Sequence, residues 1–148
     1  MSAVTIRPVK MAEITSVLDL IDEASRVPQP RPSVAQLQAV YEALQSTGGV
    51  CLGAVAENNL VGTCTVAICP NFSWSARPYA VIENVVVTQR WRQQGVGTQL
   101  LRAAVEWGKS AGCYKVVVMT GSTKPSTLRF YESAGFEGSK TGFQVRFE

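Results

Sequence analysis

The stretch from Glu83 to Thr98 constrains this chain more than any other part of the sequence. It begins with the β-branched run Val85–Thr88, which favours a strand, and continues through a polar loop that contains Gly95 and Gly97. A segment with helical apolar spacing follows. A strand that turns through glycines into a helix leaves several backbone N–H groups free at the positive end of that helix. We expect a phosphate-binding loop, because a residue without a β-carbon lets an anion approach the backbone.

Two common phosphate-binding motifs do not match this stretch. The dinucleotide fingerprint requires a third glycine where Leu100 stands. A Walker loop ending at Gly108-Lys109-Ser110 requires a glycine at the position of Ala103. The hexapeptide Arg-Gln-Gln-Gly-Val-Gly, residues 92–97, needs another explanation, and an ordinary strand–helix turn is one alternative.

Length and composition fit one domain that spans residues 1–148. A chain of 148 residues with 46% apolar and 17% charged residues can bury a core of its own. The net charge of +3 comes without a clustered basic face, so we expect no nucleic-acid partner. The sequence contains neither a signal-peptide pattern nor an apolar run of membrane-spanning length, so we expect no membrane partner and a cytoplasmic location.

Histidine is absent from the sequence, and the four cysteines have no metal-binding spacing. The absence of histidine excludes Ser-His and Cys-His nucleophile pairs. The cysteine spacing argues against zinc, and we expect no metal site. Cys51 and Cys64 stand in apolar, strand-like runs and are expected to be reduced core residues.

Apolar spacing, capping residues and turn formers predict a mixed α/β domain. The predicted helices cover residues 11–21, a segment from Ser33 to Gly48, residues 96–111 and residues 126–134. The predicted strands cover residues 4–7, 50–56, 60–68, 79–88 and 115–120, with two more at Phe136 and at 143–147. Residues 57–59 predict a hairpin turn, residues 69–78 an irregular loop, and the run 116–119 a strand buried on both faces.

A second motif, Phe-Tyr-Glu-Ser-Ala-Gly-Phe, occupies residues 130–136. It resembles the Tyr-Glu-x-x-Gly-Phe segment that ends the last helix of the GNAT superfamily of N-acetyltransferases. Residues 92–97 resemble the Gln/Arg-x-x-Gly-x-Gly/Ala motif of the same family, where it cradles the coenzyme A pyrophosphate. The two motifs occur in the family's order, about 35 residues apart, and the order of predicted elements is similar along essentially the whole chain. Packing alone offers another explanation of the second motif, with Phe130 and Phe136 in the core and Tyr131 a buried aromatic residue.

The resemblance implies a GNAT-like fold, with a central mixed sheet of about six or seven strands flanked by about four helices. It implies acetyl-coenzyme A as co-substrate and an amine as acceptor. The residues it implies for cofactor binding are Val85, Val86, Val87, Arg92, Gln93, Gln94, Gly95, Val96, Gly97, Thr98, Lys124 and Tyr131. Lys124 stands where the family often has an asparagine, so the usual amide contact is replaced by a side chain that would reach a phosphate or the acceptor.

Two catalytic residues are implied by the same resemblance. Tyr131 would supply a proton or a hydrogen bond to the leaving thiolate. Glu83 resembles a carboxylate found in some aminosugar-acetylating members and is the candidate base for the acceptor ammonium. A water relay, with Glu83 in a strand-end ion pair, is the alternative.

The acceptor is left open by the sequence. A small-molecule amine is preferred over a protein lysine or N-terminus, and over a module that binds coenzyme A without catalysis. Asp19, Asp22 and Glu23 are candidates for the acceptor side, with a solvated acidic face as the alternative. A homodimer is also kept as an alternative to a single acting chain.

Overall fold

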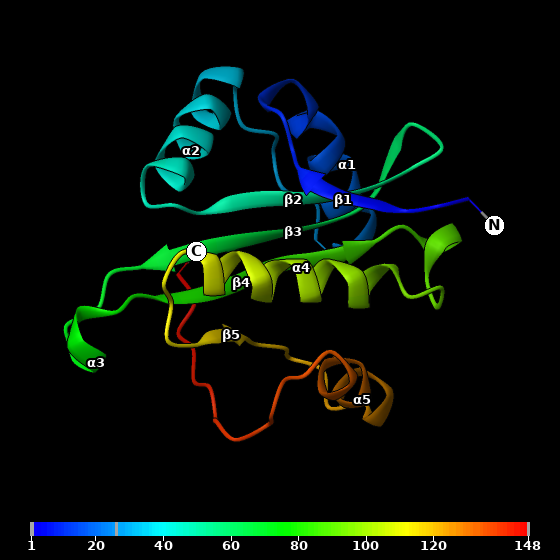
Figure 1. The fold of residues 1–148 in the computed structure, drawn as a ribbon. Helices are drawn as coiled ribbons and strands as arrows, with labels where there is room; N and C mark the ends of the chain where they lie inside the picture. Colours follow the sequence, from blue (N-terminus) through cyan, green and yellow to red (C-terminus); the bar gives the residue numbers. More distant parts are fainter. Residues whose placement is uncertain (1, 26, 148) are drawn as a thin grey trace.

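The structure is a computed structural model that describes residues 2–25 and 27–147. Within these residues five strands form one sheet in the order β1-β2-β3-β4-β5, and five helices accompany it (Figure 1). Strands β1 to β4 are antiparallel to their neighbours, whereas β5 pairs with β4 in parallel. The mixed α/β class is confirmed, but the expected six or seven strands and four helices are corrected to five of each.

The strands are β1 (Thr5–Pro8), β2 (Val50–Ala56), β3 (Asn59–Cys69), β4 (Tyr79–Val87) and β5 (Val116–Val118). The helices are α1 (Ile14–Ala24), α2 (Val34–Ser46), α3 (Ser73–Ala76), α4 (Val96–Ser110) and α5 (Pro125–Ser133). Two short 3-10 turns, η1 (Met11–Glu13) and η2 (Gln89–Trp91), precede α1 and α4.

Local sequence signals explain the ends of several elements. Ser33 and Gln36 form the predicted capping box of α2, in which each side chain accepts a hydrogen bond from the other residue's backbone N–H. The turn between β2 and β3 places Glu57 and Asn58 in the left-handed region, at φ of 52° and 61°. Such a turn matches the twist of the two strands, which is why the hairpin forms here.

The additional helix, α3, lies inside the expected irregular loop. Trp74 and Ser75 have φ of 53° and 57°, so this four-residue element is a left-handed turn. Left-handed turns have no amphipathic 3.6-residue periodicity, and this is why the sequence pattern did not predict α3.

The two strands expected at the C-terminal end do not form. Residues 136–147 have no regular secondary structure, and β5 is a short edge strand whose residues are half-buried, not buried on both faces as expected. The alternation in 143–147 satisfies the pattern of a strand, but a strand forms only where a partner takes up its backbone hydrogen bonds. No such partner lies within the described part of the chain.

The core has one cluster on each face of the sheet. Leu100, Leu101 and Ala104 of α4 pack on one face against β2, β3 and β4, and Val17 of α1 packs on the other face against Cys51. Figure 1 shows α1 and α2 above the strands and α5 beyond β5. Cys51 and Cys64 are buried free thiols, as expected, and burial raises the pKa of Cys64 to about 12. This layering holds the end of β4 and the start of α4 at one edge of the molecule.

Candidate active site

The loop between β4 and α4 is exposed, and its geometry suits an anion. Gly95 is the N-cap of α4 with a φ of 82°, and no side chain caps the first turn. A β-carbon at Gly95 would meet nothing within 4 Å, so the space beside this backbone is open. Backbone N–H groups at the start of a helix of fifteen residues therefore face an unobstructed surface, as the phosphate of a cofactor requires.

Gly97 serves packing, in contrast to Gly95. A β-carbon at Gly97 would lie 2.9 Å from the ring of Phe130 on α5. This glycine therefore lets α4 and α5 approach closely. The sequence motif had suggested that both glycines make room for phosphate, but only Gly95 has open space beside it.

The arginine of the motif is turned away from the helix terminus. Nε of Arg92 donates to the Val87 carbonyl at 2.8 Å, and its guanidinium lies 3.8 Å from the carboxylate of Glu23. Gln94 donates its side-chain amide to the Arg90 carbonyl at 2.9 Å, and Gln93 is exposed with a φ of 59°. The side chains of the motif thus shape the loop, and its backbone is what faces the open space.

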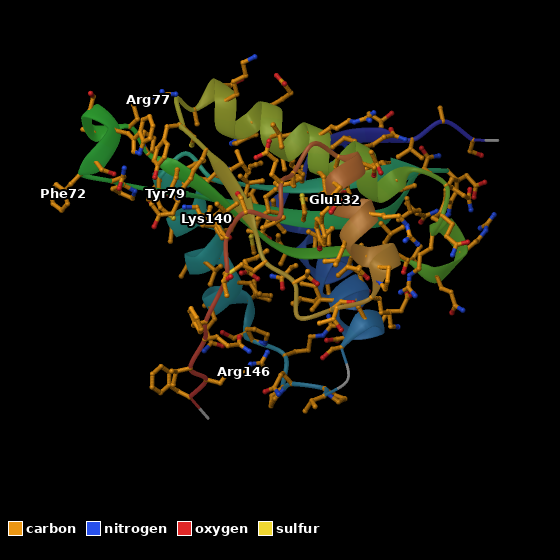
Figure 2. All side chains as sticks on the ribbon, turned by 90° about the horizontal axis from the view of Figure 1, so that it is seen from below. Phe72, Arg77, Tyr79, Glu132, Lys140 and Arg146 are labelled. Atoms are coloured by element: carbon orange, nitrogen blue, oxygen red, sulfur yellow. The ribbon has the colours of Figure 1, made fainter. Side chains whose placement is uncertain are left out.

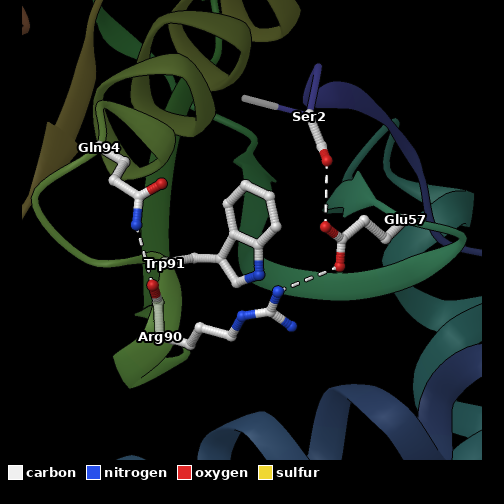
Figure 3. Close-up of a pocket in the computed structure, with 5 residues that line it drawn as sticks. All are labelled: Ser2, Glu57, Arg90, Trp91 and Gln94. Carbon is white, nitrogen blue, oxygen red and sulfur yellow. Dashed lines mark hydrogen bonds and ion pairs between the residues drawn. The ribbon is translucent and has the colours of Figure 1, made fainter.

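A hollow of about 220 Å³ lies beside this loop, lined by Ser2, Glu57, Arg90, Trp91 and Gln94 (Figure 3). Its charges are already paired: Arg90 lies 3.4 Å from the carboxylate of Glu57, which also accepts from the Ser2 hydroxyl at 3.0 Å. A carboxylate inside the hollow disfavours a phosphate, and the volume is below the range of about 300–1,000 Å³ usual for ligand pockets. We therefore do not include the hollow in the candidate site.

Glu23 of α1 braces the same loop, a role that the sequence did not reveal. Its carboxylate accepts from the Thr88 hydroxyl and from the Gln89 backbone N–H, both at 2.8 Å. These hydrogen bonds lower the pKa of Glu23, the one from Gln89 most strongly. The acceptor-side candidates are corrected accordingly, because Asp19 and Asp22 both bind Arg31 at 2.7 Å. Contacts between residues so far apart in sequence carry no local signal.

A bulge interrupts β4 at its centre. Glu83 pairs with Thr65 and Val86 with Thr63, so two residues of β4 stand opposite one residue of β3. Asn84, inside the bulge, has a φ of 54°. Asparagine tolerates that region, which is the one sequence signal that could have located the bulge.

Beyond the bulge, β4 loses its other neighbour. The pairing of β4 with β5 covers only Ala80 to Ile82. Val85, Val86 and Val87 are half-buried and continue without a paired strand on the β5 side within the described residues. The two strands separate here and leave backbone groups of β4 open to a ligand.

Tyr131 and Glu83 lie close together at this opening. Tyr131 of α5 is half-buried, with Phe130 and Phe136 at ring-centroid distances of 5.0 and 6.4 Å. Burial raises the pKa of the Tyr131 phenol, and the negative charge of the nearby Glu83 adds to this effect. Glu83 itself is exposed. Among the described residues, no protein group hydrogen-bonds to the Tyr131 hydroxyl, which leaves it available to a ligand.

Lys124 begins α5 as its N-cap residue and is exposed, and Pro125 takes the first helical position, where its missing N–H costs nothing. No three histidine, cysteine, aspartate or glutamate side chains gather into a group within residues 2–25 and 27–147. No helix in the same residues is both long and apolar enough to span a bilayer. The cytoplasmic location stays a prediction.

Comparison with known proteins identifies the family. The sequence model of the acetyltransferase (GNAT) family matches residues 14–136. This chain belongs to the GNAT acetyltransferases. It is therefore an enzyme of the acyltransferase class, and the resemblance of its two motifs to this family is confirmed.

Individual relatives agree with this membership. Glucosamine 6-phosphate N-acetyltransferase 1 of Oryza sativa is 30% identical over 139 residues, which cover 90% of this chain and 81% of that protein. Aminoglycoside N(6')-acetyltransferase type 1 of Salmonella typhimurium is 26% identical over 72% of this GNAT chain and 74% of its own length. Among solved structures, a putative acetyltransferase from Agrobacterium tumefaciens has a TM-score of 0.85 and 35% identity, covering 97% of this chain and 99% of the other.

Proposed function

We propose that this GNAT enzyme transfers an acetyl group from acetyl-coenzyme A to the primary amine of a small molecule. The observation that carries the proposal is the arrangement of Tyr131 and Glu83 beside the unpaired end of β4. The open start of α4 follows directly from that strand through η2. A thioester, an amine and a leaving thiolate require a backbone donor, a base and an acid within one site, and these elements supply all three.

The choice of acceptor class rests on the relatives. The rice and Salmonella proteins are named for glucosamine 6-phosphate and for aminoglycosides, both of which are small molecules that carry amines. We infer an acceptor of the same chemical class for this chain. Acetylation of a protein lysine or N-terminus, and binding of coenzyme A without catalysis, are the alternatives that the experiment below separates.

For the cofactor, we infer that the backbone N–H groups of the loop and of the first turn of α4 hold its phosphates. The residues concerned are Arg92, Gln93, Gln94, Gly95, Val96, Gly97 and Thr98, with Lys124 as an exposed cation on the neighbouring helix. The free edge of Val85, Val86 and Val87 would hold the pantetheine arm by strand-like hydrogen bonds. Acetyl-coenzyme A supplies an acetyl group activated as a thioester.

The acceptor must lose a proton before it can attack. An alkylammonium with a pKa near 10.4 is deprotonated in only about one molecule in 2,500 at pH 7, which corresponds to about 4.6 kcal/mol. Glu83 is exposed at the opening, where it can take this proton directly or through water. As the carboxylate next to Tyr131, it would also attract the cationic amine into position.

Charge that develops during the reaction needs fixed partners. The N–H of Val85, or of a neighbour in the bulge, is our candidate donor to the thioester oxygen, a contribution of roughly 3–4 kcal/mol where it has been measured elsewhere. Tyr131 is our candidate donor to the leaving sulfur. Since its phenol has a raised pKa, Tyr131 holds its own proton firmly and acts foremost as a hydrogen-bond donor. Holding both reactants in place adds on the order of 7–11 kcal/mol.

At the level of the chain, we propose that residues 1–148 act as one GNAT-like domain, and that two copies form a homodimer. The exposed apolar side chains at the C-terminal end are the reason for the dimer.

The test is thiol release from acetyl-coenzyme A with a panel of aminosugars, aminoglycosides, polyamines and lysine peptides. We expect release with one class of small amine and none with the peptides. Tyr131→Phe, which keeps the ring but removes the hydroxyl, is the matched control and should be slower with the same amine. Release with peptides alone would transfer the activity to proteins. Calorimetric binding without release would leave a coenzyme A-binding module.

A further inference from the structure

The C-terminal residues 143–147, here called the arm, expose three large apolar side chains on one side of an extended segment. Phe143, Val145 and Phe147 are 93%, 80% and 92% exposed and alternate with Gln144 and Arg146. A strand with this alternation presents its apolar residues on a single face. The arm thus has the composition and spacing of a half-buried strand, although the described chain does not bury it.

The arm leaves its own sheet at Gly142. A β-carbon on Gly142 would lie 3.3 Å from the sulfur of Met119, directly after β5, so the chain touches the end of β5 at this point. Figure 2 shows that the segment then runs from Lys140 to Arg146 away from the body of the molecule. The apolar residues of the arm follow Gly142 and project beyond the sheet, so they do not cover β5 of the same chain.

The sheet, in turn, has an unfilled position at β5. This strand pairs only with β4, so its second edge presents unpaired backbone groups within the described residues. Met119, next to this edge, is 64% exposed. An apolar strand without a sheet and a sheet edge without a strand are thus present in the same chain.

The surface area of the isolated chain points to a missing partner. A compact monomer of this mass has an accessible surface of about 7,400 Å² by the usual scaling, whereas this chain of 16.0 kDa exposes 10061 Å². The difference of roughly 2,700 Å² exceeds the area of about 800 Å² that each partner gives up in a standard interface. A second copy of the chain would cover such an area without requiring another protein.

We propose that the arm of one copy adds as a strand to the free edge of β5 in a second copy, and that the second copy's arm does the same in return. Each copy gives one arm and receives one, so the contact closes on itself as a twofold dimer. The two phenylalanines and the valine bury roughly 400 Å² of side chain per arm. With the receiving surfaces counted, the two arms remove roughly 1,600 Å² from water, the size of a stable interface.

The test is the mass of the chain in solution, measured by sedimentation equilibrium, which does not depend on catalysis. We expect the wild-type chain at twice its mass of 16.0 kDa. The triple variant Phe143→Ser, Val145→Ser, Phe147→Ser should be monomeric with an unchanged circular dichroism spectrum. Gln144→Ser, on the opposite side of the arm, is the matched control and should remain dimeric. Should the triple variant misfold, Val145→Pro removes a backbone donor from the arm and tests the same pairing.

Hydrogen exchange locates the contact. Amides in residues 116–120 and 143–147 should be protected in the dimer and should lose that protection in the triple variant. A wild-type monomer, or a triple variant that stays dimeric, would overturn the proposal. A dimer that depends on the arm but leaves residues 116–120 unprotected would overturn the assignment to the β5 edge.

Discussion

Gly97 and Phe130 fix the distance between α4 and α5, because a β-carbon at Gly97 would lie 2.9 Å from the Phe130 ring. The helix that begins the phosphate loop is thereby seated against the helix that carries Tyr131. The residue that makes the loop look like a phosphate motif thus also connects the cofactor side of the site to its catalytic side.

This contact predicts opposite effects of one substitution in two backgrounds. Gly97→Ala should lower the free energy of unfolding by about 1–3 kcal/mol in the wild-type chain, since the methyl group overlaps the ring. In a Phe130→Ala background the same change should be neutral or should stabilise by up to about 1 kcal/mol, because alanine is the better helix former. Urea unfolding of the four proteins completes the cycle. Equal effects in both backgrounds would show that Phe130 does not limit position 97.

Gly95 should behave differently. Gly95→Ala places a methyl group in the open space beside the loop and forces an alanine to a φ of 82°, at a cost of about 1–2 kcal/mol. We expect acetyl-coenzyme A affinity, measured by calorimetry on the folded protein, to fall at least tenfold. Gly112→Ala is the matched control, because Gly112 also has a positive φ of 81° and an open neighbourhood but lies at the other end of α4. Unchanged affinity for Gly95→Ala would remove the loop from the cofactor site.

The phenol of Tyr131 should titrate above its ordinary pKa of 10.0, because burial and the charge of Glu83 both disfavour the phenolate. The unfolded chain then releases this proton first as the pH rises, so this contribution to stability is complete below pH 10 and declines above it. Glu83→Gln removes the second cause and should shift the titration to lower pH. The difference in phenolate absorbance between each protein and its Tyr131→Phe variant measures the shift. An identical titration with and without the Glu83 charge would separate the two residues.

Turnover should show the roles of the same pair. Tyr131→Phe should reduce kcat by about 10²–10³ with little change in acetyl-coenzyme A affinity, as expected for a group that acts on the leaving sulfur.

Glu83→Gln cannot accept a proton, so its rate should rise about tenfold per pH unit toward the pKa of the acceptor amine and approach the wild-type rate there. A pH–rate profile of both proteins with one fixed amine measures this. Profiles that run parallel across the whole range would leave Glu83 without the role of base.

Away from the site, Glu13 is expected to govern stability in acid. Two hydrogen bonds from Arg7, at 2.8 and 2.9 Å, and one from the Lys10 backbone lower its pKa from 4.5 to about 2. The stabilisation is complete above pH 4.5 and is lost as the pH falls toward about 2, where the folded protein also binds the proton.

Because the Glu13 side chain is 25% exposed, solvent screening reduces the effect to about 1 kcal/mol. Urea unfolding of Glu13→Gln should show this deficit at pH 7, and the deficit should shrink in acid. A deficit that did not vary with pH would indicate lost packing in place of lost charge.

The sequence by itself determined the chemistry that repeats along the chain. Capping residues defined α2, strand alternation defined β2 and β3, and two short motifs indicated the GNAT family. These features depend on neighbours within a few residues, so their physical causes are visible in the order of the amino acids. Gly95 at the start of α4 and Pro125 at the start of α5 are examples in which one residue type satisfies a local backbone requirement.

The tertiary structure decided what depends on distant partners. It separated the open space at Gly95 from the packing contact at Gly97, assigned Glu23 to the η2 turn, and brought Glu83 close to Tyr131. It also left residues 143–147 without a strand to pair with, although their alternation is that of a strand. A side chain's role in each case depends on which groups the folded chain brings within contact distance, and a strand exists only where another backbone completes its hydrogen bonds.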